Sequence, residues 1–320
     1  MLSFAIYMKK YLFLLSFIVI LNACNNSKNP VIEEKKLIAS KILSDKVFSP
    51  DFMIKINDKL VISSSLSDTM LYVYSLPSLR YLNSSGTKGN GPEDFQLFPM
   101  FCESSDNSVY IWGYDPITIK KFSIDNNGYL NIKNLIKLPK YEAFNNMHII
   151  NDSLFIYYLP DLLKIVKYDL RNNKDLDVIQ MKKDDHNESF FYINRGSIAA
   201  NDSFLLYGYL FKKQIDIYRM RDFGIQKKIV GNYKFQKPVL GDFNTPVYYR
   251  KIIAGQKFFY TLCNENLNKE VIMEVYNYDG LLLKKITFDI PPQLFVVDEE
   301  HSAVYGYNDK YEDYLLYYKF

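Results

Sequence analysis

Between Asn57 and Phe320 the chain repeats one pattern six times: a turn, a short apolar strand, a polar gap and a second strand. The repeats begin at Asn57, Asp106, Asn151, Asn201, Gly255 and, less regularly, Glu299. Successive starts are about 50 residues apart, a period typical of solenoid and propeller proteins. This periodicity constrains the fold more than any single motif does.

Each repeat supplies four short strands. The first strand after the turn, such as residues 204–207, is apolar on both faces, as expected when a sheet is covered on both sides. The second, such as residues 215–220, alternates apolar and polar residues, which predicts a strand nearer a solvated edge. Further strands precede the turn (residues 197–200) and follow the second strand (residues 227–230). The pattern predicts an all-β fold: a six-bladed β-propeller with four-stranded blades.

The two ends of the repeat region indicate how the ring closes. The last repeat stops at Phe320 without an outermost strand, and residues 36–43 form an orphan strand before the first repeat. An N-terminal strand that joins the last blade would close the ring and remove an exposed edge. An open pair of β-sandwiches is the alternative, which the regular period disfavours.

The N-terminus resembles a bacterial lipoprotein signal. Lys9 and Lys10 precede an apolar run, residues 11–21, that is too short to span a bilayer with its flanks. The run ends in Leu-Asn-Ala-Cys, which is similar to a lipobox and implies that Cys24 is lipidated and becomes the first mature residue. A plain secretory signal with a chance cysteine is the alternative. Translation starting at Met8 instead of Met1 also fits the pattern.

This reading divides the chain into three parts: a signal peptide at residues 1–23, a tether at residues 24–35 and the propeller at residues 36–320. Acyl chains on Cys24, palmitate among them, would anchor the protein in a membrane, since each buried methylene contributes about 0.8 kcal/mol. No acidic residue follows Cys24 directly. Similarity to lipoprotein sorting rules then implies the outer membrane of the cell envelope, with a periplasmic and a surface-facing orientation both open.

Composition excludes one class of partner. Removal of residues 1–23 would lower the formal net charge from +3 to +1, which is not the basic footprint of a nucleic-acid-binding protein. The 28 Tyr and 23 Phe residues favour strands over helices. Cys102 and Cys263 fall in the second and fifth repeats, so two separate buried thiols are predicted.

A glycine-rich segment carries a family resemblance. Residues 86–95 read Gly-Thr-Lys-Gly-Asn-Gly-Pro-Glu-Asp-Phe and follow Tyr-Ser-Leu-Pro-Ser-Leu at residues 74–79. Together with the lipobox and the repeats, they resemble the TolB-like six-bladed propeller lipoproteins common in Bacteroidetes. The resemblance covers essentially the whole mature chain. It implies the propeller fold and names no ligand.

The same segment has a structural interpretation. Gly86, Gly89 and Gly91 permit positive φ and close backbone approach, and Pro92 ends strand pairing. Phe95 is expected to anchor the loop in the groove between two blades. A phosphate-cradling loop is the alternative, but no helix follows the segment and no Gly-Lys-Ser/Thr sequence is present.

Two arginines are the candidate ligand-binding residues. Counted back from the turns, Arg195 and Arg250 enter the innermost strands of the fourth and fifth repeats, near the mouth of the channel. Two converging guanidinium groups are able to hold a carboxylate, a sulfate or a sugar acid. The alternative is that each arginine pairs with an acid of a neighbouring blade or with backbone carbonyls.

No metal or cofactor is predicted. Asp-Asp-His-Asn-Glu at residues 184–188 is the densest group of metal-type ligands, but its spacing matches no metal motif and favours a solvated loop. The Asn and Asp residues of the turns are explained by the positive φ of tight hairpins. Tyr114, Tyr209 and Tyr307 are expected as exposed aromatics near the channel mouth, where they would stack on a sugar.

The sequence therefore predicts an envelope lipoprotein whose propeller binds an envelope protein or a glycan, or serves as a protein–protein scaffold. The alternative is a lyase or glycosidase that acts on a carbohydrate or another anionic substrate at the channel mouth. No Ser-His-Asp order and no Gly-x-Ser-x-Gly motif is present, so no catalytic residue is assigned and an enzyme is not favoured.

Overall fold

The computed structural model describes residues 31–44, 46–91, 93–96, 98–113, 118–138, 144–181, 193–232, 245–264 and 271–320. The chain divides into two compact units, residues 1–32 and residues 33–320, and all of the described strands belong to the second. None of the helices within these ranges has the length and apolar character needed to cross a membrane.

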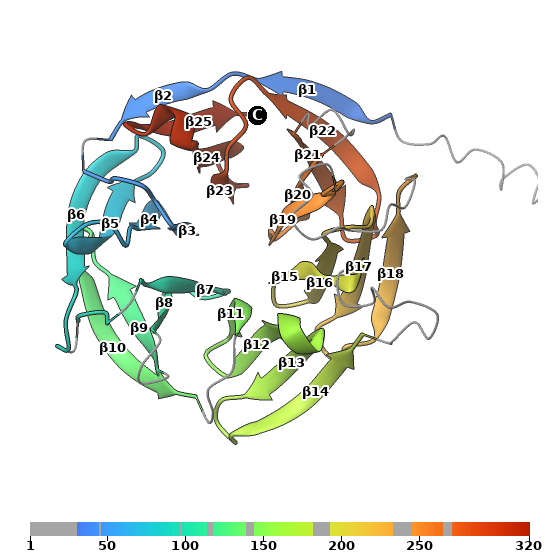
Figure 1. Cartoon of the computed structure of the whole chain (residues 1–320), viewed down its shortest axis with the longest axis horizontal. Helices are drawn as coiled ribbons and strands as arrows, with labels where there is room; N and C mark the ends of the chain where they lie inside the picture. The colour runs from blue at the N-terminus through green and yellow to red at the C-terminus, as the bar shows by residue number, and fades with distance from the viewer. Residues whose placement is uncertain are drawn as a thin grey trace, which may run out of the picture. The chain divides into compact units, whose positions relative to one another are not determined.

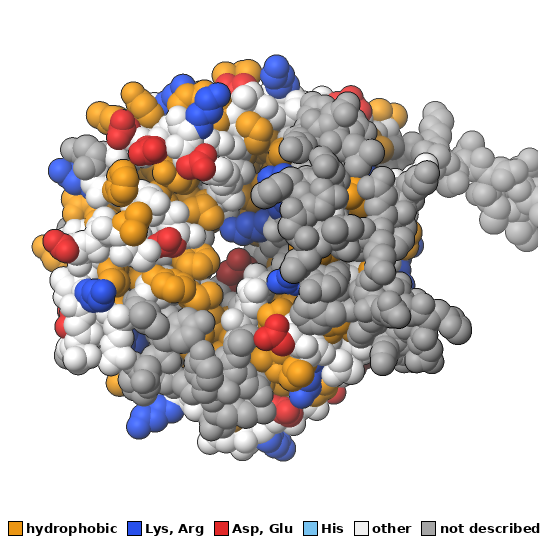
Figure 2. All heavy atoms as spheres, viewed as in Figure 1, with side chains coloured by type: hydrophobic (Ala, Val, Ile, Leu, Met, Phe, Trp, Pro, Cys, Tyr) orange, Lys and Arg blue, Asp and Glu red, His pale blue; other side chains and the backbone are white. Residues whose placement is uncertain are grey.

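The strands of residues 33–320 form six blades around a central axis (Figure 1), so the predicted six-bladed propeller is confirmed. The space-filling view shows an opening at the centre of the ring (Figure 2).

The first three blades run in chain order. From the centre outward, blade one consists of β3 (Phe52–Ile56), β4 (Lys59–Ser63), β5 (Thr69–Ser75) and β6 (Arg80–Thr87). Blade two consists of β7 (Met100–Ser104), β8 (Val109–Gly113), β9 (Thr118–Ile124) and β10 (Leu130–Lys137). Blade three consists of β11 (Asn145–Ile150), β12 (Leu154–Leu159), β13 (Lys164–Asp169) and β14 (Lys174–Gln180).

The other three blades complete the ring. Blade four consists of β15 (Gly196–Ala200), β16 (Phe204–Tyr209), β17 (Gln214–Arg219) and β18 (Ile225–Val230). Blade five consists of β19 (Tyr249–Ala254), β20 (Phe258–Asn264), β21 (Val271–Asn277) and β22 (Leu282–Phe288). Blade six consists of β23 (Leu294–Asp298), β24 (Ala303–Tyr307), β25 (Tyr314–Lys319) and β2 (Ser40–Leu43). Two short 3-10 helices are η1 (Pro160–Leu162) and η2 (Asp309–Tyr311).

Strand β2 closes the ring by pairing antiparallel with β25 of blade six, as predicted. Residues 36–43, however, do not form one continuous strand. Strand β1 (Glu33–Leu37) pairs parallel with β22 of blade five, and it begins inside residues 24–35, where a tether was expected. Asp289 holds the break between β1 and β2, because its carboxylate accepts the Ala39 N–H at 2.9 Å and its own N–H donates to the Leu37 carbonyl at 3.1 Å.

The hydrophobic core is divided among the interfaces between blades. Six clusters of buried apolar side chains each draw on two neighbouring blades. Tyr158 and Tyr207, for example, join blades three and four, and Leu60 and Tyr305 join blades one and six. Each blade is thus covered on both faces, which confirms the two-sided burial predicted for the strands that follow the turns. Burial of apolar surface contributes roughly 25 cal/mol per Å².

The prediction that the alternating strands lie near a solvated edge is wrong. Strands β17 and β21 are buried along their central residues, and Asp216 and Glu274 within them are 2% and 1% exposed. The Tyr209 hydroxyl donates to Asp216 at 3.0 Å, and the Tyr276 hydroxyl donates to Glu274 at 2.7 Å. These carboxylates are tolerated in the interior of the sheet because tyrosine hydroxyls donate hydrogen bonds to them.

Cys102 and Cys263 are both buried free thiols, as predicted. They lie on the innermost strand of blade two and on the second strand of blade five.

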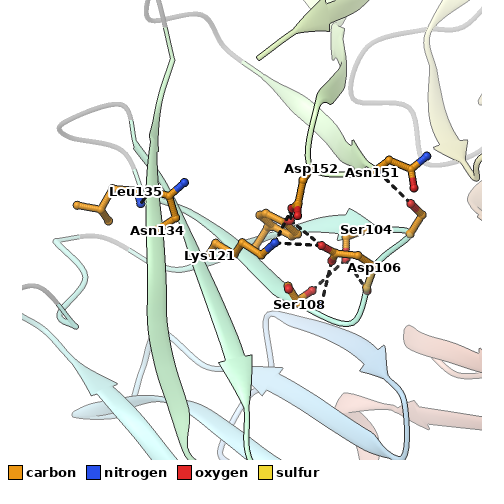
Figure 3. A network of polar contacts seen from close by, with 10 residues as sticks. Ser104, Asp106, Ser108, Lys121, Asn134, Leu135, Asn151 and Asp152 are labelled. Carbon is orange, nitrogen blue, oxygen red and sulfur yellow. Dashed lines mark hydrogen bonds and ion pairs between the residues drawn. The ribbon is translucent and has the colours of Figure 1, made fainter. Parts of the chain in front are cut away.

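The hairpin turns join neighbouring blades as well as neighbouring strands. Between blades two and three, the Tyr110 hydroxyl lies within hydrogen-bond distance of the Asp106 and Asp152 carboxylates and shares its one proton between them, and the Lys121 ammonium group contacts the same two carboxylates (Figure 3). Burial, reinforced by these carboxylates, raises the pKa of Tyr110, so the hydroxyl stays a donor at neutral pH. The turn residues of two repeats therefore share one polar network.

A second such contact joins blades five and six. The Glu299 carboxylate accepts the backbone N–H groups of residues 256–258 at 2.9 to 3.1 Å and the Tyr260 hydroxyl at 3.1 Å. A Cβ atom on Gly255 would lie 2.2 Å from Glu299 Oε1, so the close approach requires glycine at this turn.

We expect Glu299→Gln to lower the free energy of unfolding by about 1–3 kcal/mol, because an amide group would turn an N–H donor toward groups that are themselves donors. Urea unfolding measures the change. Glu300→Gln is the matched control: this neighbour is exposed, and its loss should stay within about 0.5 kcal/mol. Equal losses for the two variants would contradict the assigned role of Glu299.

Candidate functional site

A cavity of about 510 Å³ lies where the innermost strands of the blades meet, and it is lined by residues of all six blades. Figure 2 shows acidic and basic side chains within this central opening. Cavities of a few hundred Å³ with a small number of polar groups are typical of small-molecule sites.

The walls of the cavity differ in character. Blades six, one and two contribute mostly apolar residues: Phe52, Met53, Ile54, Met100, Phe101, Pro291, Pro292 and Leu294. The charged and polar lining residues are Glu103, Asn145, Asn146, His148, Ser197, Arg250, Lys251, Gln293 and Asn308.

Strand β19 brings two consecutive cations to the cavity and has a β-bulge at the same place. Tyr249 pairs with Cys263 and Lys251 with Leu262, which leaves Arg250 as an extra residue with no partner on β20. Arg250 and Lys251 both line the cavity, as the consecutive residues 52–54 of the regularly paired strand β3 also do.

Strand β11 of blade three has a comparable irregularity. Its pairing with β12 shifts between Asn145 and His148, and Asn146 adopts a positive φ of 45°. Residues 145–148 all line the cavity. Bulges and unusual backbone conformations of this kind are frequent next to functional sites.

Glu103 and His148 form the closest pair of titratable groups in the cavity. Strands β7 and β11 run parallel with His148 opposite Glu103, and His148 Nδ1 lies 3.6 Å from Glu103 Oε2. His148 is 1% exposed, and its Nδ1 has no hydrogen-bond partner among the described residues. Burial lowers the pKa of His148, although Glu103 and a hydrogen bond with the Ile198 backbone oppose this. The imidazole is therefore neutral at neutral pH and presents an unpartnered nitrogen.

Blades four and five contribute one hydroxyl group, that of Ser197, and two cations, Arg250 and Lys251, to the lining of the cavity. Burial lowers the pKa of Lys251, and the charge of Glu103 opposes this effect. The Lys251 ammonium group donates to the Phe295 carbonyl at 3.1 Å. Ser197 Oγ is buried without a hydrogen-bond partner in the described part of the chain. Arg250 is exposed, and no carboxylate within the described ranges forms an ion pair with it.

Of the two predicted arginines, the structure brings Arg250 to the cavity. Arg195 precedes β15 directly and is not among the described lining residues. It acts instead near Tyr158, where burial raises the pKa of the tyrosine and the Arg195 charge opposes that rise. Lys251 therefore takes the place beside Arg250 that the sequence analysis gave to Arg195.

The predicted aromatic rim is wrong for two of its three members. Tyr209 and Tyr307 are 5% and 6% exposed, and the Tyr209 hydroxyl is bonded to Asp216, so neither ring is free to stack on a sugar. Tyr114 lies outside the described residues, as do residues 184–188 and Cys24.

The glycine segment lies at the interface of blades one and two. Phe95 is 2% exposed and belongs to the core cluster of these blades, and a Cβ atom on Gly86 would lie 2.7 Å from its ring. The Asp94 carboxylate accepts the Gly91 N–H at 2.9 Å and the Thr87 hydroxyl at 2.5 Å. A carboxylate thus occupies the place where a phosphate would bind, which favours the structural interpretation. Pro92 lies outside the described residues.

Glu103 and His148 were not assigned to a site from the sequence, although a signal existed. Each lies three residues before its turn, and the same position in the other repeats is apolar: Ile54, Ile198, Ile252 and Val296. Alignment of the six repeats would have shown these two residues as polar departures from an apolar position.

A second cluster of titratable groups lies at the turn of blade six. Ligand atoms of Asp298, Glu300 and His301 lie within 4.8 Å of one another. Asp298 is already paired with His301 Nδ1 at 2.8 Å and with Lys55 Nζ at 3.5 Å. Lys55, from β3 of blade one, therefore supplies the positive charge that a metal ion would bring.

The neutral state of His148 predicts a pH dependence of stability. In the unfolded chain the His148 imidazole takes up a proton with an ordinary histidine pKa of about 6.5. In the folded chain it does so only at a lower pH, because burial lowers its pKa. Unfolding therefore becomes easier as the pH falls below about 6.5, by up to about 1.4 kcal/mol per pH unit.

Urea unfolding between pH 7.5 and about pH 5 tests this dependence. We expect the free energy of unfolding of His148→Gln to depend less steeply on pH, because the variant has no imidazole to protonate at this position. His301→Gln, which changes a half-buried histidine outside the cavity, should keep it. An unchanged slope in His148→Gln would refute the neutral buried histidine.

The chain matches one family. The model of the family described as "TolB-like 6-blade propeller-like" matches residues 29–300. No curated protein matches the sequence.

Solved structures share the fold at low identity. The WD40 repeats of RRP9 have 8% identity and a TM-score of 0.54, over 88% of this chain and 97% of that one. A Bacteroides fragilis protein described as a "putative exported protein" has 14% identity and a TM-score of 0.54, over 90% and 99% of the two chains. BamB from Moraxella catarrhalis has 6% identity and a TM-score of 0.39, over 84% and 69%, a score too low to support an argument. These similarities concern the fold alone.

Proposed function

Because the chain belongs to the TolB-like six-bladed propeller family, we propose that it is a lipid-anchored protein of the cell envelope whose propeller is a binding module. Its ligand is a small polar molecule that binds in the central cavity. The observation that carries this proposal is the convergence of charged and polar residues from several blades, two of them with unpartnered buried atoms, on that cavity.

Buried polar groups in folded proteins nearly always have hydrogen-bond partners, and exceptions call for an explanation. His148 Nδ1 and Ser197 Oγ both lack a partner among the described residues, and both residues line the cavity. Arg250 has no acidic partner there either. A bound ligand with acceptors and donors would satisfy the two buried atoms and pair with the exposed Arg250 guanidinium group, and the closed ring would hold these groups in fixed positions.

The proposed location rests on the N-terminal sequence. Residues 1–23 would be the signal peptide, with the lipid on Cys24. The tether expected at residues 24–35 would end at residue 32 and the propeller expected at residues 36–320 would begin at Glu33, because β1 starts there. The Bacteroides fragilis protein with the same fold is described as exported, which supports an envelope location. The outer membrane is the proposed membrane, facing either the periplasm or the surface.

An enzyme is the second candidate, and the Glu103–His148 pair favours it. A carboxylate 3.6 Å from an imidazole is suited to general acid–base work. Glycosidases generally use two carboxylates, whereas Glu103 is the one carboxylate among the described lining residues. The arrangement therefore favours a lyase over a glycosidase.

Lipidation predicts the behaviour of a single variant. We expect the wild-type chain to incorporate labelled palmitate and to sediment with the membrane fraction. Cys24→Ser should incorporate no label and leave the membrane fraction, because serine provides no thiol for the lipid. Cys102→Ser, which changes a buried thiol of the propeller, is the control and should still be labelled. Membrane association of unlabelled Cys24→Ser would contradict the lipid anchor.

Binding in the cavity is tested by thermal unfolding of the full chain in detergent micelles. Neutral sugars, dicarboxylates, amino acids and short peptides are the probes. At a concentration about 100 times its Kd, a ligand should stabilise the fold by about 2.7 kcal/mol. Arg250→Ala should abolish the shift, whereas Arg80→Ala, an exposed arginine on the outer strand β6, should retain it. Equal shifts in both variants would place binding outside the cavity.

A further inference from the structure

The charges of the cavity are separated across the ring. The one acidic lining residue of the described part, Glu103, belongs to blade two, and the cations Arg250 and Lys251 belong to blade five. Blades two and five face each other across the central axis (Figure 1). Glu103 affects the pKa of Lys251, but no described ion pair within 4.0 Å joins them. The acidic wall and the basic wall are thus not joined by an ion pair across the cavity, so both face its interior.

This separation restricts the charge of the ligand. A monoanion bound at Arg250 would face the negative charge of Glu103, and a monocation at Glu103 would face the two cations. A molecule with an ammonium group at one end and a carboxylate at the other meets an opposite charge on each wall. Complementary potentials of this kind determine specificity.

The uncharged groups fit the same type of molecule. His148 Nδ1 and Ser197 Oγ are available to amide groups of a ligand, because neither has a partner in the described part of the chain. The apolar wall formed by Phe52, Met53 and Phe101 is suited to aliphatic side chains. A neutral sugar would leave both charged walls without counter-charges.

We propose that the cavity binds a short peptide of two or three residues with free termini, its amino end toward Glu103 and its carboxylate toward Arg250. This rests on the proposed function, since it assigns a ligand class to the same cavity. Lys251 strengthens the positive potential of blade five, while its own ammonium group stays bonded to the Phe295 carbonyl.

Calorimetric titration of the full chain in detergent micelles tests the inference with matched ligands. The probes are the dipeptide alanyl-leucine, its N-acetyl derivative and its C-terminal amide, with succinate, putrescine and glucose as further probes. The free dipeptide should bind, and each capped form should bind at least about tenfold more weakly, because one wall then loses its counter-charge.

Two variants test which residue binds the amino end of the peptide and which binds its carboxylate. In Glu103→Gln the difference between the free and the N-acetylated dipeptide should disappear. In Arg250→Ala the difference between the free dipeptide and its amide should disappear. Glu34→Gln on β1 and Arg80→Ala on β6 change exposed residues of the outer strands and should keep both differences. Unfolding midpoints of all four variants confirm that the fold is retained.

The outcomes separate the peptide inference from the proposed function. Equal binding of free and capped dipeptides, or tighter binding of succinate, putrescine or glucose, would overturn the peptide inference. Loss of that binding in Arg250→Ala would leave the cavity as the binding site. No binding of any probe would overturn both proposals.

Discussion

The two-sided burial of every blade is the constraint on which the rest of this structure depends. A single four-stranded blade cannot bury both of its faces, and each face here packs against a neighbouring blade in one of six apolar clusters. The burial is complete only when the last blade meets the first. This is why β2, from the start of the chain, supplies the outer strand of blade six, and why β1 adds an edge to blade five.

Polar groups at two of the turns between blades are paired. Glu299 accepts four hydrogen bonds from blade five, and Asp152 meets Tyr110 and Lys121 of blade two. Buried polar atoms without a hydrogen-bond partner occur both in the cavity, at His148 and Ser197, and elsewhere in the described chain, at Ser63 and Thr261 for example. The cavity differs from the other places because charged and polar residues of several blades converge there. This convergence supports a binding role for the cavity.

Two inner strands that line the cavity are irregular. The inner strands of blades three and five both lose their register with the second strand, and these two strands provide His148, Arg250 and Lys251. Other register shifts lie on the outer strand pairs, for example between β5 and β6. The ring sets blade five opposite blade two, so the two cations and Glu103 lie on opposite walls of the cavity.

The sequence by itself determined the architecture and the family, because both follow from local patterns repeated along the chain. The six repeats of about 50 residues set the number of blades. The turn residues marked the hairpins, and the orphan strand before Asn57 indicated how the ring closes. Tertiary structure alone decided which side chains reach the cavity. His148 faces Glu103 because β7 and β11 pair in parallel, Arg250 lines the cavity from the inner strand β19 of blade five, and Arg195 does not line it in the described structure. Inter-blade register and bulges arise from packing between residues far apart in the chain, and no local pattern encodes them.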